Sequence, residues 1–373
     1  MGIQRAPRVG VFTKQLDAWR SGSGHQLNEI MARVLDLNEG RERRLDFTFL
    51  HYKPSENPVY GRVRELLVPR NPLRFAGVLR RERFDLVHYT PLTIYSPIWC
   101  VPNKKSATIH GVEQLLLPQF FGPLEMFHER FLVPIFARKM DGILTVSNST
   151  RDYLVRHFGV REERVTVAYN GVGPQFRVRD RASLKAPGKY GAAGPYVFHI
   201  SRFSERKNPW VLLEAFSRFA LAGFPHKLVC AGSGWDNEAV RTAAMRLGIG
   251  ERLILPGFIP GEEAAQFLSG AEFFVFPSLA EGFGMPNAEA LAAGCPVITS
   301  AAFAVPEVVG DAAIVIQNPR DSGAFADAMI RLAQNPLLRE DLIRRGLLRA
   351  RIFSWEEGAR KLLAMYDRIL GEI

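Results

Sequence analysis

Short apolar runs alternate with longer amphipathic stretches along the whole chain. Short apolar runs are typical of the buried strands of a parallel sheet, and the stretches between them have helical periodicity. In the first half, the pattern predicts strands at 8–12, 46–50, 84–89, 106–110, 142–146 and 164–169. In the second half, it predicts strands at 196–200, 226–231, 252–255, 273–276, 296–299 and 312–316. An amphipathic helix follows from about Trp355 to Leu370. The chain is therefore expected to be an α/β protein.

Glycine and proline are concentrated between the two series of strands, where apolar residues are few. This composition is typical of a linker between domains. A chain of 373 residues is also too long for one ordinary core and about right for two. The sequence thus predicts an N-terminal domain at 1–172, a linker at 173–194 and a C-terminal domain at 195–354.

The overall composition is that of a globular protein, with 47% hydrophobic and 23% charged residues. No apolar stretch is long enough for a signal peptide or a membrane span, so a cytoplasmic location is expected. Cys100, Cys230 and Cys295 lie far apart and without metal-ligand spacing, which predicts buried free thiols and no zinc site.

The net charge of +10 is concentrated in the first half of the chain. Residues 1–178 contain 26 Lys and Arg against 17 Asp and Glu, and the remaining residues contain 22 against 21. One arginine cluster lies at 41–44 and a longer one extends from Arg62 to Arg83. Solvated helix faces are the simplest interpretation. The alternative is a patch for an anionic surface, and without interleaved aromatic residues a membrane is favoured over nucleic acid.

The segment from Glu281 to Glu289, EGFGMPNAE, carries the strongest chemical pattern. It follows the predicted strand 273–276, and its glycines allow the backbone amides to approach a ligand closely. The two glutamates supply carboxylates that accept hydrogen bonds from sugar hydroxyls. A tight turn and a favourable charge near a helix N-terminus are the structural alternatives. The whole segment favours a functional role.

This segment resembles the signature of the family-4 retaining glycosyltransferases of the GT-B fold. That signature has two glutamates separated by seven residues, followed by a small-residue helix and Gly-x-Pro-Val, and the stretch from Glu281 to Ile298 matches it. The resemblance extends over nearly the entire chain. It implies two Rossmann-like domains whose parallel sheets face each other across a cleft, with the final helix, 355–373, crossing back onto the N-terminal domain.

The resemblance also implies roles for individual residues. Glu281 would contact the transferred sugar and Glu289 the nucleotide ribose, with Phe283, Gly284 and Met285 lining the donor site between them. The stretch from Ser201 to Asn208 resembles the family's Gly-Arg…Lys-Asn element, with Ser201 in place of glycine. Arg202 and Lys207 would then hold the donor diphosphate, whose leaving group develops negative charge that fixed cations stabilise.

Four further residues, in three places along the chain, are candidates. Gly22 and Gly24 resemble the family's N-terminal glycine loop, which approaches the donor, although such a pair is commonly just a turn. His110 ends a predicted strand in a context where the family has a histidine beside the transferred sugar, so it is assigned to sugar orientation. Gly232 follows another strand and would border the nucleotide base, with a simple strand–helix turn as the alternative.

No Asp-x-Asp motif is present, so neither a metal nor another cofactor is expected. Residues 118–139 are rich in phenylalanine and end in basic residues. They are either a core helix or an apolar edge that rests on a membrane together with the arginine clusters. The expected partners are therefore a nucleotide-sugar donor, a saccharide acceptor that is lipid-linked, and the anionic inner face of the membrane, and not nucleic acid.

The resemblance implies a retaining transfer of a hexosyl group from a nucleotide diphosphate sugar to a hydroxyl. GDP-mannose is the leading donor, with UDP-glucose and a UDP-N-acetylhexosamine as alternatives. An alternative of another class is a catalytically silent scaffold subunit that only binds the nucleotide sugar. A nicotinamide-dependent oxidoreductase is disfavoured because neither glycine loop completes GxGxxG.

Overall fold

The computed structural model describes residues 5–18, 22–90, 92, 96–98 and 104–371. The chain divides into two compact units. Unit 1 contains the residues up to Gly171 together with Ser354–Ile373, and unit 2 contains Val172–Phe353. Among the described residues, no helix is both long and apolar enough to cross a membrane.

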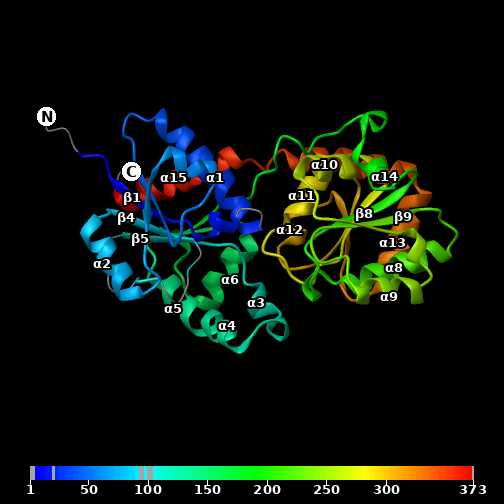
Figure 1. Cartoon of the computed structure of the whole chain (residues 1–373), viewed down its shortest axis with the longest axis horizontal. Helices are drawn as coiled ribbons and strands as arrows, with labels where there is room; N and C mark the ends of the chain where they lie inside the picture. The colour runs from blue at the N-terminus through cyan, green and yellow to red at the C-terminus, as the bar shows by residue number, and fades with distance from the viewer. Residues whose placement is uncertain (1–4, 19–21, 91, 93–95, 99–103, 372–373) are drawn as a thin grey trace. The chain divides into compact units, whose positions relative to one another are not determined.

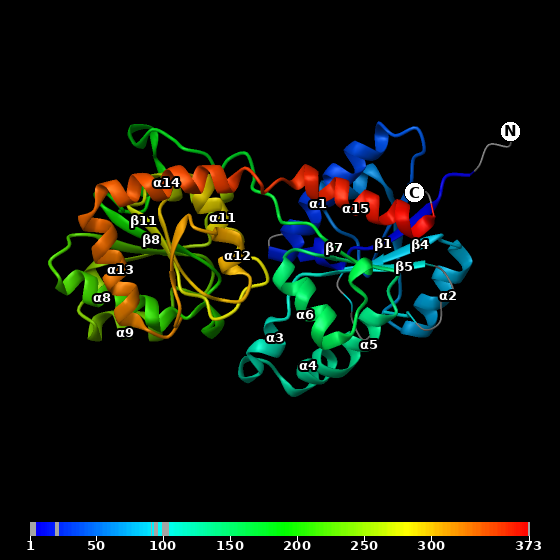
Figure 2. The same ribbon diagram turned by 180° about the vertical axis from the view of Figure 1, so that it is seen from behind.

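Unit 1 is built on a parallel sheet of seven strands in the order β3-β2-β1-β4-β5-β6-β7. The strands are β1 (Arg8–Phe12), β2 (Asp46–His51), β3 (Arg64–Leu67), β4 (Leu86–Tyr89), β5 (Lys104–Ile109), β6 (Gly142–Thr145) and β7 (Val165–Val167). The helices are α1 (Gly22–Glu39), α2 (Pro72–Glu82), α3 (Glu113–Leu116), α4 (Pro123–Phe127), α5 (Val133–Arg138), α6 (Asn148–Phe158) and α15 (Trp355–Leu370), with a π-helical turn, η4 (His128–Leu132), between α4 and α5. In Figures 1 and 2, α1 and α15 cover one face of this sheet, and α2, α5 and α6 cover the other.

The last helix, α15, belongs to the core of unit 1. Its apolar side, which includes Leu362, Met365 and Tyr366, is buried beside α1 and the strands β6 and β7. Gly142, the first residue of β6, permits this close approach, since a Cβ atom there would lie 2.7 Å from Ile369. The C-terminal helix therefore packs on the sheet formed by the N-terminal part of the chain.

Unit 2 contains a second parallel sheet, of six strands in the order β10-β9-β8-β11-β12-β13. The strands are β8 (Tyr196–Ile200), β9 (Lys227–Ala231), β10 (Leu253–Gly257), β11 (Phe273–Phe276), β12 (Val297–Ser300) and β13 (Ala313–Ile316). The helices are α7 (Ala186–Lys189), α8 (Pro209–Leu221), α9 (Glu238–Arg246), α10 (Gly261–Gly270), α11 (Met285–Ala292), α12 (Val305–Val309), α13 (Ser322–Gln334) and α14 (Pro336–Ala350). Helices α10, α11 and α14 cover one face, and α8, α9 and α13 cover the other (Figures 1 and 2).

The structure differs from the sequence-based expectation in three places. The edge strand β3 was not predicted, because its sequence, RELL, lies within the arginine-rich stretch. The segment 173–194, expected to be a linker, contains α7 and contributes Phe176, Ala186 and Ala192 to a core of unit 2. Helix α1 starts at Gly22, so the expected glycine loop is the helix's first turn.

Candidate functional site

The candidate site of unit 2 lies where its strand order reverses. Strand β8 is flanked by β9 and β11, so the connections that leave β8 and β11 run to opposite faces of the sheet. Such a switch point opens a crevice at the carboxyl ends of the strands, and ligands bind there in open α/β sheets. The loop after β8 contains Lys207, and the loop after β11 contains Glu281.

Glu281 and Lys207 meet directly at this point. The ammonium of Lys207 donates to Oε1 of Glu281 over 2.5 Å, and the hydroxyl of Ser278 donates to the same oxygen over 2.6 Å. Arg206 also reaches this oxygen, with Nη1 at 3.0 Å. Three groups thus converge on one carboxylate oxygen, and we call Glu281, Lys207, Arg206 and Ser278 the Glu281 cluster.

The Glu281 cluster keeps its carboxylate ionised although the residue is only 7% exposed. Burial opposes the charged form, but Lys207, Arg206 and the hydroxyl of Ser278 outweigh it and lower the pKa of Glu281 to about 2. A buried carboxylate is tolerated only when cations and hydrogen-bond donors surround it. Arg206 and Ser278 were not among the sequence candidates, although Arg206 adjoins Lys207 in the same motif.

Glu289 has a different environment from Glu281. It lies in α11 and is partly buried, and no hydrogen bond or ion pair links its side chain to the Glu281 cluster in the part of the chain that the structure describes. Burial raises the pKa of Glu289 to about 7. The two glutamates of the motif therefore have opposite electrostatic character, one fixed in the charged form and one poised to titrate near neutrality.

The remaining candidates of unit 2 divide into exposed and packed positions. Arg202 is exposed, and its side chain has no ion-pair partner among the described residues. Phe283 is buried with its ring 5.5 Å from that of Phe353, and Met285 is the partly buried first residue of α11. Gly284 caps that helix with φ +83°, a left-handed conformation that favours glycine.

Gly232 is explained by packing. Its φ is +116°, and a Cβ atom there would lie 2.0 Å from the carbonyl oxygen of Ser201. The loop after β9 thus contacts the loop after β8 backbone to backbone, and the buried Trp235 donates to the same carbonyl over 2.8 Å. The expected contact with a nucleotide base stays a prediction.

In unit 1, His110 lines a cavity of about 240 Å³ beyond the carboxyl end of β5. Burial lowers the pKa of His110 to about 4, so the imidazole is neutral at physiological pH. Its Nε2 atom is buried and has no hydrogen-bond partner among the described residues. Ser23, which lies between Gly22 and Gly24 in the first turn of α1, lines the same cavity. The structure therefore brings the N-terminal glycine pair close to His110.

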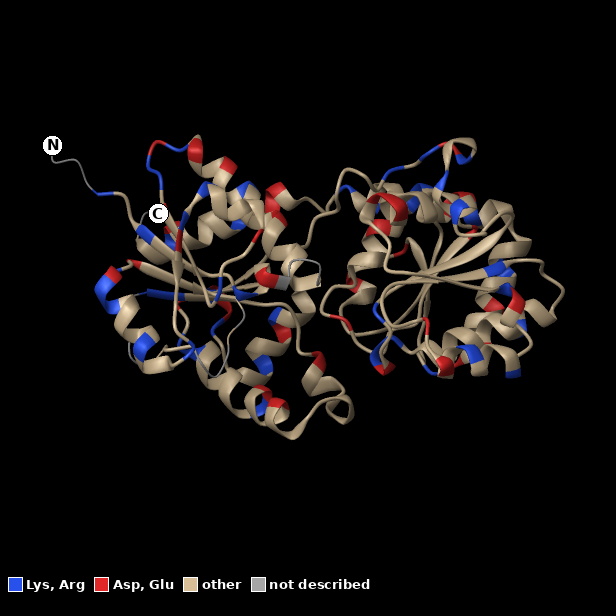
Figure 3. Cartoon of the chain, viewed as in Figure 1, with Lys and Arg blue, Asp and Glu red and all other residues tan. Residues whose placement is uncertain are grey.

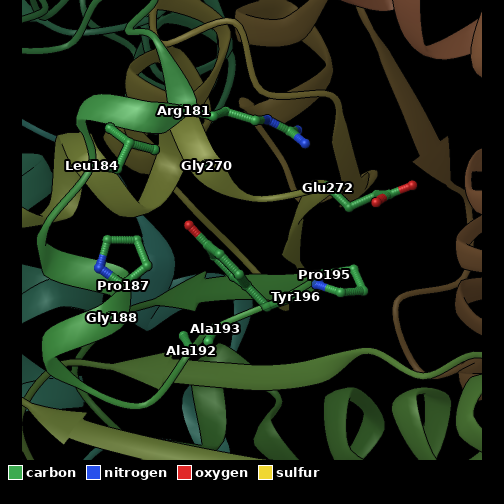
Figure 4. A pocket seen from close by; sticks show the side chains of 11 residues that line it. Arg181, Leu184, Pro187, Gly188, Ala192, Ala193, Pro195, Tyr196, Gly270 and Glu272 are labelled. Carbon is green, nitrogen blue, oxygen red and sulfur yellow. The ribbon is translucent and has the colours of Figure 1, made fainter.

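A second cavity, of about 470 Å³, lies at the amino ends of strands in unit 2 (Figure 4). Its polar groups already bond within the protein. The hydroxyl of Tyr196 donates to Phe267, Arg181 donates to Ala271, and Glu272 lies 3.2 Å from Arg339. This cavity lies at the amino ends of the strands, whereas the Glu281 cluster lies at their carboxyl ends. The three polar side chains named here already have partners within the protein, so the cavity gives no evidence of a polar ligand.

Cys230 and Cys295 are buried free thiols, and Cys100 lies outside the described residues. Burial raises the pKa of both thiols, so neither is activated as a nucleophile. Within the described ranges, no group of three or more His, Cys, Asp and Glu side chains is arranged to hold a metal ion.

Two family models match this chain, one in each unit. Residues 29–176 match the model of glycosyltransferase family 4, and residues 181–349 match the model of glycosyl transferases group 1. The chain belongs to the family-4 glycosyltransferases and is a glycosyltransferase.

Several relatives transfer mannose, according to their names. The O-antigen chain mannosyltransferase B of Escherichia coli is 28% identical over 298 residues, which cover 77% of each chain. The phosphatidyl-myo-inositol mannosyltransferase of Mycobacterium leprae is 27% identical over 329 residues, 86% of this chain and 79% of that protein. The chain spans only 36% of the serotype-specific mannosyltransferase WbdA of Escherichia coli, at 25% identity over 76% of its own length.

Solved structures share the fold over almost the whole chain. Sucrose-phosphate synthase from Thermosynechococcus elongatus aligns with a TM-score of 0.76 at 19% identity, covering 98% of this chain and all of that one. HepE from Anabaena, solved in complex with UDP, aligns with a TM-score of 0.78 at 16% identity, covering 98% of this chain and 100% of that one. The fold is GT-B.

The raised pKa of Glu289 predicts a pH dependence of stability. Its folded-state pKa of about 7 exceeds the ordinary 4.5, so the folded protein retains a proton that the unfolded chain loses as the pH rises between these values. Stability contributed by the protonated form is therefore lost across this window. Glu289→Gln should raise the free energy of unfolding by about 2 kcal/mol at pH 8, a figure that is reduced because the side chain is partly exposed. At pH 4.5 the substitution should leave the free energy of unfolding nearly unchanged.

Thermal unfolding of the ligand-free protein at both pH values measures this difference. Glu214→Gln, at an exposed position of α8, is the matched control and should have no effect at either pH. An equal effect of Glu289→Gln at pH 4.5 and pH 8 would contradict the assignment.

Proposed function

We propose that this glycosyltransferase moves a mannosyl group from GDP-mannose to a lipid-linked saccharide, with retention at the anomeric carbon. The observation that carries the proposal is the Glu281 cluster at the switch point of unit 2, in a chain that belongs to the family-4 glycosyltransferases. Mannose is favoured because relatives that cover most of the chain are named as mannosyltransferases.

In the proposed donor complex, Lys207 and Arg202 bind the diphosphate. A lysine ammonium carries three N–H donors, so Lys207 can hold Glu281 and a phosphate oxygen together. The contacts to Glu281 converge on Oε1, and Oε2 then accepts a hydroxyl of the transferred sugar. Glu289 accepts the ribose hydroxyls, and neutral His110 orients the sugar.

The proposed reaction proceeds on one face of the sugar. The bond from the anomeric carbon to the diphosphate oxygen breaks, a bond to the acceptor oxygen forms, and the acceptor proton passes to an oxygen of the departing GDP. The cations stabilise the negative charge that develops on the diphosphate. No step calls for a metal ion, so metal independence remains part of the proposal.

A membrane-associated acceptor is supported by relatives and by the surface of unit 1. One relative is named for phosphatidyl-myo-inositol. Within 118–139, Leu124, Phe127 and Phe131 are 74%, 53% and 51% exposed. Phe127 and Phe131 contact each other, and Arg130 lies over the ring of Phe131. These side chains form an apolar edge with a cation beside it, which suits the boundary between lipid headgroups and acyl chains.

The arginines between Arg62 and Arg83 do not act as one free patch. Arg62 pairs with Asp36 and Glu39, and Arg64 pairs with Glu82. The basic residues in and around α2 are exposed, and they are Arg70, Arg74, Arg80, Arg81 and Arg83. Basic residues colour parts of this helix blue in Figure 3. Helices α2 and α5 cover the same face of the sheet (Figures 1 and 2), so a basic helix accompanies the segment that carries the apolar edge on one side of unit 1.

A panel of nucleotide sugars tests the donor. GDP-mannose should raise the melting temperature more than UDP-glucose or UDP-N-acetylglucosamine, because a ligand stabilises the folded state by mass action. GDP-mannose should also be hydrolysed slowly without acceptor, in the presence of a strong chelator. A larger shift with a UDP-sugar would show that the donor is that UDP-sugar and not GDP-mannose. Binding without hydrolysis or transfer would indicate the scaffold alternative.

The two glutamates should affect binding differently. Glu289→Gln should weaken the binding of both GDP and GDP-mannose. Glu281→Gln should weaken the binding of GDP-mannose and leave that of GDP largely unchanged. If GDP binding supplies ribose donors that favour the ionised form of Glu289, it should release protons near pH 7. The calorimetric enthalpy in wild type should then vary with the ionisation enthalpy of the buffer, and this variation should disappear in Glu289→Gln. Equal losses for both ligands in both variants would refute the assigned roles.

Vesicle co-sedimentation tests the membrane. The protein should bind anionic vesicles, and binding should weaken with salt, because each basic residue near such a surface contributes about 1 kcal/mol that salt screens. Phe127→Ser/Phe131→Ser should reduce binding, whereas Leu337→Ser, at a 77% exposed position in unit 2, should not. Absence of binding at low salt would refute membrane association while leaving the glycosyltransferase activity unaffected.

A further inference from the structure

Phe303 has a backbone conformation that its own side chain opposes. It lies in the loop between β12 and α12, and its φ is +52°. Among the described residues, three residues other than glycine have a positive φ, and Phe303 is the aromatic one, beside Arg83 and Asn208. A positive φ is an outlier at a bulky residue, because the Cβ atom crowds the backbone.

The loop forms a tight turn in which this position favours glycine. The N–H of Val305 donates to the carbonyl of Ala302 over 3.1 Å, so Phe303 and Ala304 are the two central residues. Ala304 has φ −85° and ψ −7°, which together with the positive φ of Phe303 match a type II′ turn. The first central residue of such a turn is normally glycine. Backbone strain of this kind is found mainly at functional sites, where the surrounding structure enforces it.

This turn is fixed to the Glu281 cluster. Phe303 pairs with Glu281 in an isolated parallel β-bridge, and the N–H of Ala304 donates to the carbonyl of Glu281 over 3.2 Å. The hydroxyl of Ser300, the last residue of β12, donates to the carbonyl of Ser278 over 2.5 Å. Residues that pair in this way start their side chains on the same side of the sheet. The partly buried side chain of Phe303 therefore begins beside that of Glu281, at the carboxyl ends of the strands.

A carboxylate beside an aromatic ring suits a sugar. A pyranose has hydroxyls around its edge, which donate to a carboxylate, and C–H groups on its faces, which pack against an aromatic ring. A phosphate suits neither group, because the face of an aromatic ring is also negative. We propose that Phe303 covers one face of the transferred sugar and helps to determine which sugar the site accepts. This inference rests on the proposed function in that Glu281 binds the transferred sugar, but it requires no particular sugar or base.

Binding of matched ligand pairs tests this role. Calorimetry of the full chain uses GDP-mannose with GDP and UDP-glucose with UDP, so the members of each pair differ by the sugar. Phe303→Ala should weaken the binding of the sugar nucleotide about tenfold and leave that of the nucleoside diphosphate nearly unchanged. Phe303→Tyr keeps an aromatic ring and should bind both ligands as wild type does.

Phe303→Gly separates backbone strain from recognition. The alanine and glycine variants both lack the ring, but only glycine relieves the turn. Phe303→Gly should therefore have a melting temperature about 2–4 °C above that of Phe303→Ala. The two variants should bind the sugar nucleotide equally weakly, because recognition depends on the ring and not on the strain.

Phe224→Ala is the matched control for the loss of a ring. Phe224 is partly buried like Phe303, but it precedes β9 at the amino ends of the strands, where its ring stacks on that of Phe219 at 4.5 Å. Phe224→Ala should lower the melting temperature and leave the binding of all four ligands unchanged. A loss of stability alone would then not account for a loss of sugar-nucleotide binding in Phe303→Ala.

Several results would overturn the inference. These are wild-type sugar-nucleotide binding in Phe303→Ala, an equal loss for both members of a pair, failure of Phe303→Tyr to bind the sugar nucleotide, and equal melting temperatures of the glycine and alanine variants. Absence of wild-type binding to both sugar nucleotides would overturn it as well. Tighter binding of UDP-glucose than of GDP-mannose would refute the proposed donor, but the comparison of UDP-glucose with UDP would still test Phe303. The two proposals therefore fail separately.

Discussion

The ion pair between Lys207 and Glu281 organises the candidate site of unit 2. A buried carboxylate is costly unless cations and hydrogen-bond donors surround it, so this charge dictates the structure around it. Around the pair, Leu279 donates to the carbonyl of Arg206, and the side chain of Asn208 donates to the carbonyl of Pro277. The loops after β8 and β11 are thereby fixed to each other. A cation near a developing diphosphate charge is effective because it is held in place before the reaction begins.

The hydrophobic pattern of the sequence predicted the strands of both sheets well, and its failures have physical causes. Buried strands of a parallel sheet are apolar on both faces, and all twelve predicted strands, including the short edge strand β7, overlap strands of the structure. Strand β3 is an edge strand in which Arg64 and Glu65 are exposed, and it therefore lacks the apolar signal. The segment 173–194 is rich in glycine and proline, yet buried alanines anchor it to unit 2.

The candidate site was predictable only where its residues lie within one motif. Glu281, Glu289 and Lys207 stand out because their spacing resembles that of a family. Spacing does not show that Glu281 and Lys207 touch, or that Glu289 has no cation beside it among the described residues. Ser278 is an ordinary turn residue until its hydroxyl is seen on Oε1. Gly232 had a functional interpretation, whereas its geometry is accounted for by the approach of the Ser201 carbonyl. The cavity of unit 1 is lined by residues from Gln15 to Val133, and no local sequence pattern connects them.

Charge is distributed differently at the two sites, and this difference is chemically consistent with a glycosyltransferase. Unit 2 gathers Lys207 and Arg206 around its carboxylate, whereas the described lining of the cavity in unit 1 has carboxylates and no cation. Yet unit 1 is the more basic part of the chain, since residues 1–178 hold most of the excess of Lys and Arg. Among the described arginines of unit 1, Arg62 and Arg64 lie in surface ion pairs, and none lines the cavity. A transferase must bind one anionic and one hydroxyl-rich substrate without exchanging them. If the donor diphosphate binds beside the cations of the Glu281 cluster, as proposed, its charge matches that site and is disfavoured by the carboxylates of the cavity in unit 1.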